Sequence, residues 1–148
     1  MMTRRDWGAL VARAGFGVQP SRSDRRPADP LVWTPDTIDW TPDDPPGATY
    51  AVLHGRRDDP AAVFTYAFRL PGGVWAPVPR HSRTAHVTVV RGTLRLGRGR
   101  TVDRAATVVI PAGGFFVVPA GEWHYEGSDG ECVIIGTAQG GWTTTMAP

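Results

Sequence analysis

Short apolar stretches separated by turn-forming residues are the main pattern along this chain. Residues 62–70 alternate strictly, which places Phe64, Tyr66 and Phe68 on one buried face of a predicted strand. Four further stretches have the length of a strand, namely residues 50–54, 107–110, 115–118 and 131–137. The pattern predicts about nine or ten short strands and no internal helix, which is an all-β fold.

Three details of the pattern concern the middle of the chain. The segments 107–110 and 115–118 are continuous apolar runs, which is expected where both faces of a strand are covered. If the strand that precedes them is unbroken, His81 and Arg83 share one of its faces. A tight hairpin turn is predicted at residues 89–94, because Gly92 is free to adopt a positive φ.

The first 30 residues differ from the rest of the chain. Residues 3–14 have the spacing of a short amphipathic helix, and residues 18–30 are rich in Arg, Ser, Pro and Asp, as in a linker. We therefore divide the chain into an N-terminal helix and arm, residues 1–30, and a β-barrel, residues 31–148. A helix this short is marginal in water, so we expect it to dock as an arm or lid.

Length and composition support one domain. A chain of 148 residues can bury a sizeable core, and its 18 Gly and 14 Pro favour short strands over long helices. One cysteine excludes an internal disulfide framework. No stretch reaches the roughly 20 apolar residues that a membrane-spanning helix needs, so we expect a cytoplasmic protein without a membrane partner.

All 16 basic residues are arginine, and several fall in one predicted hairpin: Arg91, Arg95, Arg98, Arg100 and Arg104. Clustered cations of this kind can bind nucleic acid. No aromatic residues interleave with them for base stacking, so a solvated hairpin without a nucleic-acid partner is the interpretation that we prefer.

Glycine, proline and histidine stand at fixed spacings in two linked segments: Gly73, His81 and Gly92 in the first, and Gly113, Pro119, Gly121 and His124 in the second. The segments resemble the two motifs of the cupin family, G-x5-H-x-H-x3–4-E-x6-G and G-x5-P-x-G-x2-H-x3-N. The resemblance covers residues 34–142. It implies a cupin-type double-stranded β-helix, which is a jelly-roll barrel, and it implies a homodimer.

The sequence departs from these motifs at three positions. Pro79, Ala85 and Ser128 stand where the family has a histidine, a glutamate and an asparagine. The resemblance implies a site for iron, manganese, nickel, zinc or copper made of three histidines and one glutamate. Only His81 and His124 keep their positions in that set. The motifs therefore indicate a degenerate metal site, and a barrel without a cofactor is our first expectation.

A metal would need a third ligand besides His81 and His124, because two imidazoles alone rarely hold a divalent ion in the cell. Candidate ligands elsewhere in the sequence are Glu122, Glu126, His86 and His54. With such a ligand the barrel would hold Fe, Mn, Ni or Zn and act as a metal-dependent dioxygenase or isomerase. This is our second hypothesis.

Without a metal, two convergent imidazoles can donate and accept protons near neutral pH. We take His81, His124, Arg83 and Glu122 as the candidate catalytic residues, with Arg83 able to bind a carboxylate or enolate oxygen. A turn could aim Glu122 inward. Six aromatic residues are predicted to shape a cavity for an apolar substrate: Phe64, Tyr66, Phe68, Trp75, Phe115 and Trp123.

Our first hypothesis is therefore an enzyme that isomerises or cyclises a small, apolar, natural-product-like molecule by acid/base chemistry. The third hypothesis is a non-catalytic module that binds or senses a small molecule. The fold alone does not decide between these functions.

Overall fold

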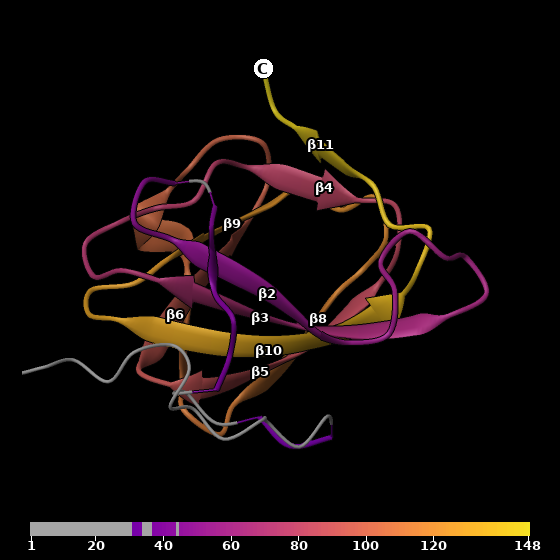
Figure 1. Ribbon diagram of the computed structural model, residues 1–148. Coiled ribbons are helices and arrows are strands. Elements are labelled where there is room, and N and C mark those ends of the chain that lie inside the picture. The colour runs from indigo at the N-terminus through magenta and orange to yellow at the C-terminus, as the bar shows by residue number, and fades with distance from the viewer. Residues whose placement is uncertain (1–30, 34–36, 44) are drawn as a thin grey trace, which may run out of the picture.

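The computed structural model describes residues 31–33, 37–43 and 45–148, and the predicted N-terminal helix and linker lie outside them. The regular secondary structure of the described chain is almost entirely β, which confirms the predicted fold class (Figure 1). Its one short helical turn is the 3-10 helix η2 (Arg104–Ala106), which Asp103 caps by accepting from backbone N–H groups.

Eleven strands form three sheets in the described part of the chain. The largest sheet has the order β1 (Thr41–Pro42), β2 (Thr49–His54), β3 (Val63–Leu70), β10 (Cys132–Gln139), β5 (Ala85–Arg91) and β8 (Phe115–Val118). A second sheet has the order β7 (Val108–Pro111), β6 (Thr93–Arg98) and β9 (His124–Gly127). The third pairs β11 (Thr144–Met146) with β4 (Pro79–His81), and every pairing is antiparallel.

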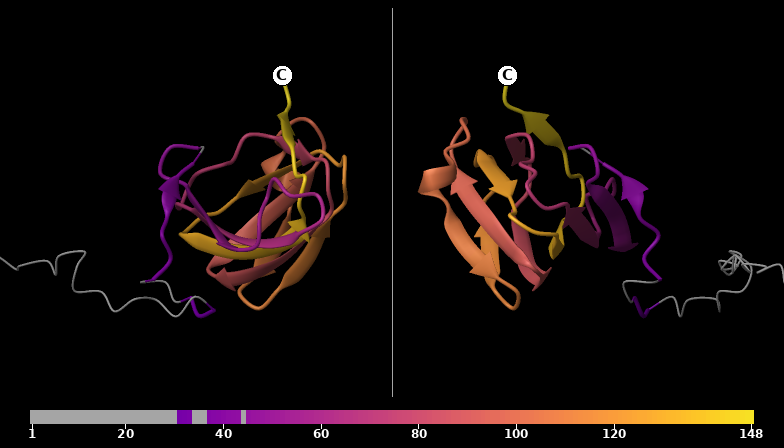
Figure 2. Two further views of the ribbon diagram at one scale, coloured as in Figure 1. Left: turned by 45° about the vertical axis from the view of Figure 1, so that its right-hand side comes forward. Right: turned by 90° about the vertical axis from the view of Figure 1, so that its left-hand side faces the viewer.

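The sheets surround an interior, as in a jelly roll. Strands β2, β3, β10 and β5 lie side by side, and β4 and β11 lie across the barrel from them (Figure 1). The turned views show the purple strands of the early chain and the orange strands of the later chain on opposite sides of the barrel (Figure 2). Residues far apart in sequence therefore face one another across the interior.

The main hydrophobic core packs β5, β6, β7, β8 and β10 together, with Val87, Val89 and Leu94 among its most buried side chains. Cys132, the one cysteine of the chain, belongs to this core. Burial raises the pKa of its thiol to about 12, and the carboxyl of Glu126 adds to the rise. Cys132 therefore packs as a small apolar side chain.

A second, smaller cluster lies on β3 and β10 and determines the shape of the interior. The predicted alternation is confirmed, because Phe64 and Tyr66 are buried and Phe68 is half-buried on the same face of β3. Gly136 on β10 pairs with Tyr66 in the register, and the ring of Tyr66 lies where a side chain at Gly136 would stand. Tyr50 on β2 stacks on Tyr66 with ring centroids 5.6 Å apart.

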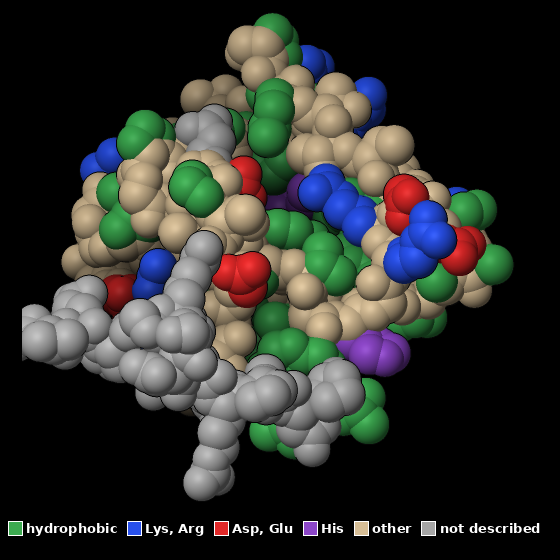
Figure 3. All heavy atoms as spheres, in the orientation of Figure 1, with side chains coloured by type: hydrophobic (Ala, Val, Ile, Leu, Met, Phe, Trp, Pro, Cys, Tyr) green, Lys and Arg blue, Asp and Glu red, His purple; other side chains and the backbone are tan. Residues whose placement is uncertain are grey.

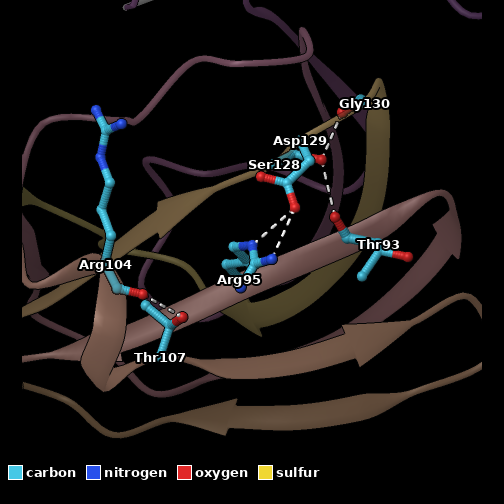
Figure 4. A network of polar contacts seen from close by, with 7 residues as sticks. All are labelled: Thr93, Arg95, Arg104, Thr107, Ser128, Asp129 and Gly130. Carbon is cyan, nitrogen blue, oxygen red and sulfur yellow. Dashed lines mark hydrogen bonds and ion pairs between the residues drawn. The ribbon is translucent and has the colours of Figure 1, made fainter.

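Two turn residues are informative, and one of them, Gly92, was predicted from the sequence. Gly92 has a φ of 72° in the turn between β5 and β6, so the expected positive φ is confirmed. Ser128, at the position where the resemblance implies an asparagine, is 1% exposed, and its hydroxyl donates to the carbonyl of Thr93 at 2.8 Å (Figure 4). Ser128 therefore ties the turn after β9 to the start of β6.

Two expectations about the middle of the chain are wrong. Val108, Val109 and Phe115 are 66%, 53% and 60% exposed, although we expected their strands to be covered on both faces. The reason is that β7 and β8 each form an edge of their sheet. The strand after residue 79 is also not continuous, because the chain leaves β4 at His81 and enters β5 in another sheet at Ala85.

The close approach of Gly136 and Tyr66 gives a test of the packing. Gly136→Ala would push a methyl group into the Tyr66 ring, so we expect it to lower the free energy of unfolding by about 1–3 kcal/mol in urea denaturation. Gly130→Ala is the matched control, because a methyl group there meets no atom within 4 Å. Equal effects of the two substitutions would contradict this packing.

Candidate functional site

A cavity of about 220 Å³ lies between the largest sheet and the strands β4, β9 and β11. Its walls are mostly aromatic and aliphatic, and Figure 3 looks into it, with a histidine side chain visible inside the hollow between an acidic and a basic side chain. The polar or ionisable residues that line it are Asp43, Tyr50, Arg57, Tyr66, His81, His124, Glu126 and Thr144.

His81 and His124 meet in this cavity, as the two motifs predict. His81 lies at the end of β4 and His124 at the start of β9, and their ring centroids are 5.0 Å apart. The backbone N–H of Gly121 donates to the carbonyl of His81 at 2.7 Å, which holds the turn before β9 against β4. His124 is only 3% exposed.

The hydroxyl of Thr144 fixes the tautomer of His81. Thr144 Oγ1 accepts from Trp142 Nε1 at 3.1 Å and from Arg57 Nη2 at 3.3 Å, which uses both lone pairs of the oxygen. Its own proton therefore points to His81 Nδ1, 3.1 Å away. Since Nδ1 accepts, the single proton of the neutral imidazole lies on Nε2.

His124 has the opposite tautomer. Its Nδ1 lies 3.2 Å from the carbonyl oxygen of Glu122, and a carbonyl oxygen can only accept a hydrogen bond. Nδ1 of His124 therefore carries a proton, and in the neutral imidazole Nε2 keeps a free lone pair. The cavity thus holds an N–H donor at His81 and a basic nitrogen at His124.

Burial keeps His81 neutral. It lowers the pKa of His81 to about 3, and the nearby His124 and Arg57 act in the same direction. The ring of Trp142 lies against it, with centroids 4.3 Å apart. His81 is therefore a neutral hydrogen-bond donor over the whole physiological pH range.

Glu126 adds a carboxyl group to the same cavity. It lies two residues after His124 on β9, so both side chains point to the interior. Burial raises the pKa of Glu126, and the nearby His124 opposes that rise. Burial likewise raises the pKa of Tyr66, with further contributions from Glu126 and Tyr50. From the sequence we considered Glu126 only as a metal ligand. In the structure its carboxyl group also interacts electrostatically with His124 and Tyr66.

The structure places the other sequence candidates outside the cavity. Glu122 forms an ion pair with Arg98 and does not turn inward. Arg83 is exposed, because the strand that would have carried it breaks between β4 and β5. His86 is exposed and stacks on Phe115, and His54 is exposed near Trp33.

Of the six aromatic residues expected to shape the cavity, Phe64, Tyr66 and Phe68 line it. Trp75 instead packs on Tyr125 and covers Gly127. Phe115 lies on the exposed face of β8. Trp123 lies between two guanidinium groups, with Arg80 4.8 Å and Arg100 5.1 Å from its ring centroid.

The hairpin arginines are largely paired on the surface. Arg91 forms an ion pair with Glu131, and Arg95 forms one with Asp129, which Figure 4 shows. Arg98 pairs with Glu122, while Arg100 and Arg104 lie over the rings of Trp123 and Trp75. The solvated hairpin without a nucleic-acid partner stays a prediction from the sequence.

Among the cavity residues that the sequence analysis did not predict, four contact the histidines or one another: Tyr50, Arg57, Trp142 and Thr144. Tyr50 begins a predicted strand, but the sequence does not say which face of that strand points inward. Arg57 lies in a polar turn, and Trp142 and Thr144 follow the last predicted strand in a glycine-rich segment. No local pattern brings those residues to the cavity. The pairing of β11 with β4 places Thr144 beside His81, and the backbone hydrogen bond from Trp142 to Arg57 joins the other two.

The donor set does not fit the metal site of the family. Pro79 and Ala85 line the cavity at two of the four expected ligand positions and supply no donor atom. Among the residues that the structure describes, no three His, Cys, Asp or Glu side chains are arranged to hold a metal ion. His81 and His124 lie close together, but Glu126 does not complete a ligand set with them.

Solved structures resemble this chain in fold at low sequence identity. An uncharacterised conserved protein with a double-stranded β-helix domain from Klebsiella pneumoniae is 14% identical, with a TM-score of 0.62 over 79% of this chain and 96% of that one. A cupin domain from Schizosaccharomyces pombe is 16% identical, with a TM-score of 0.59 over 74% of each chain. A salicylate 1,2-dioxygenase from Pseudoaminobacter salicylatoxidans in complex with gentisate is 14% identical, with a TM-score of 0.56 over 68% of this chain and 29% of that one.

These likenesses concern the fold alone. No protein-family model matches the sequence, and no curated protein matches it. In the described residues, no helix has the length and apolar character to cross a membrane.

The lowered pKa of His81 predicts a pH dependence of stability. The unfolded chain binds a proton at His81 near pH 6.5, but the folded chain does so only near pH 3. Between these values the unfolded state binds more protons, so the free energy of unfolding falls as the pH falls from about 6.5 toward 3. We expect His81→Gln to flatten this slope in urea denaturation at a series of pH values.

The control for that slope is His86→Gln, which removes an exposed histidine on the outer face of β5. Its stability should fall with pH as in the original protein. A slope that His81→Gln leaves unchanged would contradict a buried, neutral His81.

The tautomers can be observed directly by ¹⁵N NMR of the imidazole nitrogens. We expect the proton on Nε2 in His81 and on Nδ1 in neutral His124. Thr144→Val keeps the side-chain shape and removes the hydroxyl donor, so part of the His81 population should move its proton to Nδ1. Thr145→Val, at the exposed neighbouring position, should change neither imidazole. A proton on Nδ1 of His81 before any substitution would refute the assignment.

Proposed function

We propose that this chain, which has the cupin double-stranded β-helix fold, is an enzyme that moves a proton within a small organic molecule bound in the barrel. Isomerisation and cyclisation are reactions of this kind, and neither needs an oxidant. One observation carries the proposal: two imidazoles of opposite tautomer, a base at His124 and a donor at His81, line one mostly apolar cavity.

His124 is the base in this proposal. The lone pair on its Nε2 removes a proton from a carbon next to a carbonyl group, and negative charge develops on the carbonyl oxygen. His81 donates a hydrogen bond from Nε2 to that oxygen and keeps its proton, because a neutral imidazole is a poor acid. The imidazolium of His124 then returns the proton to another atom of the same molecule, so atoms and charge balance.

Glu126 supports the charged intermediate state of His124. Burial favours the neutral form of Glu126 and the nearby His124 opposes this, so an imidazolium on His124 makes the carboxylate form of Glu126 more favourable. The low exposure of His124 strengthens this interaction, since little water screens it.

We propose that the reaction proceeds without a metal. The support is the donor set, in which Pro79 and Ala85 leave His81 and His124 without the further ligands of the family site. The homodimer and the cytoplasmic location stay predictions from the sequence.

The test is exchange of acidic C–H protons for deuterium in D₂O, followed by ¹H NMR, with 2-indanone as a one-carbonyl probe. We expect the protein to accelerate exchange, and His124→Gln to reduce the acceleration by about 10²–10⁴-fold. His81→Gln should also slow exchange, because the oxyanion loses its donor. His86→Gln is the control, since His86 lies outside the cavity and should leave the rate unchanged.

Three results would overturn the proposal. Exchange that is equally fast in His124→Gln would remove the base from the mechanism. Exchange that stops with a chelator and returns with Fe, Mn, Ni or Zn would assign the chemistry to a metal. Tight binding of the probe without any exchange would instead favour a non-catalytic binding module.

A further inference from the structure

Arg57 occupies a special place at the mouth of the cavity. It lies in the turn between β2 and β3, and it is exposed while also lining the cavity. Its Nη2 donates to Thr144 Oγ1 at 3.3 Å, and its guanidinium lies 5.7 Å from the ring centroid of Tyr50. The backbone carbonyl of Arg57 accepts from Trp142 N–H, which holds the turn against the C-terminal segment.

Among the described residues Arg56, the neighbouring arginine, has a carboxylate ion-pair partner, and Arg57 does not. Arg56 forms an ion pair with Asp58, and both carboxylate oxygens accept from its guanidinium. No carboxylate among the described residues forms an ion pair with Arg57. The side-chain hydrogen-bond partners of Arg57 among the described residues are Thr144 and Tyr50, so its five N–H groups are not all used.

The charge of Arg57 acts inside the cavity. It helps to lower the pKa of His81 and opposes the raised pKa values of Tyr50 and Tyr66. Arg57 is the one permanently cationic side chain among the described residues that line the cavity. The acidic groups there are Asp43 and Glu126, and burial favours the neutral form of Glu126.

The walls next to Arg57 suit a flat ligand. Tyr50 and Tyr66 stack on one side, and Trp142 lies 6.2 Å from Tyr66 between ring centroids. The cavity volume of about 220 Å³ is somewhat larger than the roughly 150 Å³ that accommodates benzene in an engineered protein cavity. A molecule of about one ring with a small substituent therefore fits.

We propose that Arg57 binds the anionic group of the substrate, which is a small planar molecule carrying a carboxylate or a phosphate monoester. This inference rests on the proposed function and names the substrate class for the same cavity. A guanidinium presents parallel N–H groups that match two oxygens of either anion.

The position of Arg57 also orients the reacting part of the substrate. Thr144 Oγ1 joins Arg57 to His81, so an anion bound at Arg57 lies next to the donor imidazole. The rest of the molecule then extends along the aromatic wall toward His124 and Glu126. This replaces Arg83, which we expected from the sequence to bind the anion, by an arginine that lines the cavity.

The test compares benzoate with benzamide, which has the same shape without the charge, by isothermal titration calorimetry. We expect benzoate to bind at least about tenfold more tightly than benzamide, because a charge-assisted pair is stronger than a neutral one. Arg57→Gln should remove this preference while leaving the affinity for benzamide nearly unchanged. Titration should also shift the NMR signals of His81 and His124, which places the ligand in the cavity.

Two control variants separate charge from structure. Arg56→Gln removes an adjacent arginine that does not line the cavity, so the preference for benzoate should persist. Thr144→Val removes the hydrogen bond of Arg57 to Oγ1 but keeps the cation, so the preference should persist there too. Phenyl phosphate distinguishes the two anions, since tighter binding than benzoate would identify the phosphate monoester as the preferred group.

The inference is overturned if benzoate and benzamide bind equally or not at all, or if Arg57→Gln keeps the preference. Its failure is distinct from failure of the proposed function. Exchange of 2-indanone protons without a preference for benzoate would reject the anion site alone, and a preference for benzoate without exchange would reject the proton-transfer enzyme alone.

Discussion

The arrangement of the site depends on one oxygen atom with two lone pairs. Thr144 Oγ1 receives N–H groups from Arg57 and Trp142, so its own proton has one direction left, toward His81. These partners come from the turn between β2 and β3, from the segment before β11 and from β4. A single hydroxyl therefore couples three separate segments of the chain to the protonation state of one imidazole.

The same constraint gives two chemically identical side chains different roles. His81 is held by a hydroxyl donor and His124 by a carbonyl acceptor, so the proton lies on opposite nitrogens of the two rings. A metal would have required lone pairs from both. With proline and alanine at the other two ligand positions, the cavity keeps one lone pair and one N–H group, which suits proton transfer better than coordination.

The sequence was a good guide to what local patterns determine. The alternation of Phe64, Tyr66 and Phe68 and the turn at Gly92 follow from spacing along the chain, and the resemblance to the cupin motifs implied the meeting of His81 with His124. The sequence did not predict side-chain direction correctly where the chain passes from one sheet to another, as at Arg83, because the period of two applies only within one strand. Thr144, Trp142 and Arg57 could not be found, since their place depends on contacts between segments far apart in sequence: the pairing of β11 with β4 and the backbone hydrogen bond from Trp142 to Arg57.

The burial of Cys132 has a consequence for the handling of the protein. A thiol whose pKa is raised to about 12 by its surroundings is almost never a thiolate at neutral pH, so oxidants and disulfides attack it slowly. Because it is the one sulfhydryl in the chain, no alternative cross-link can form within a molecule. The barrel should therefore keep its fold under reducing and oxidising conditions alike, and the redox state of its surroundings places little constraint on where it can work.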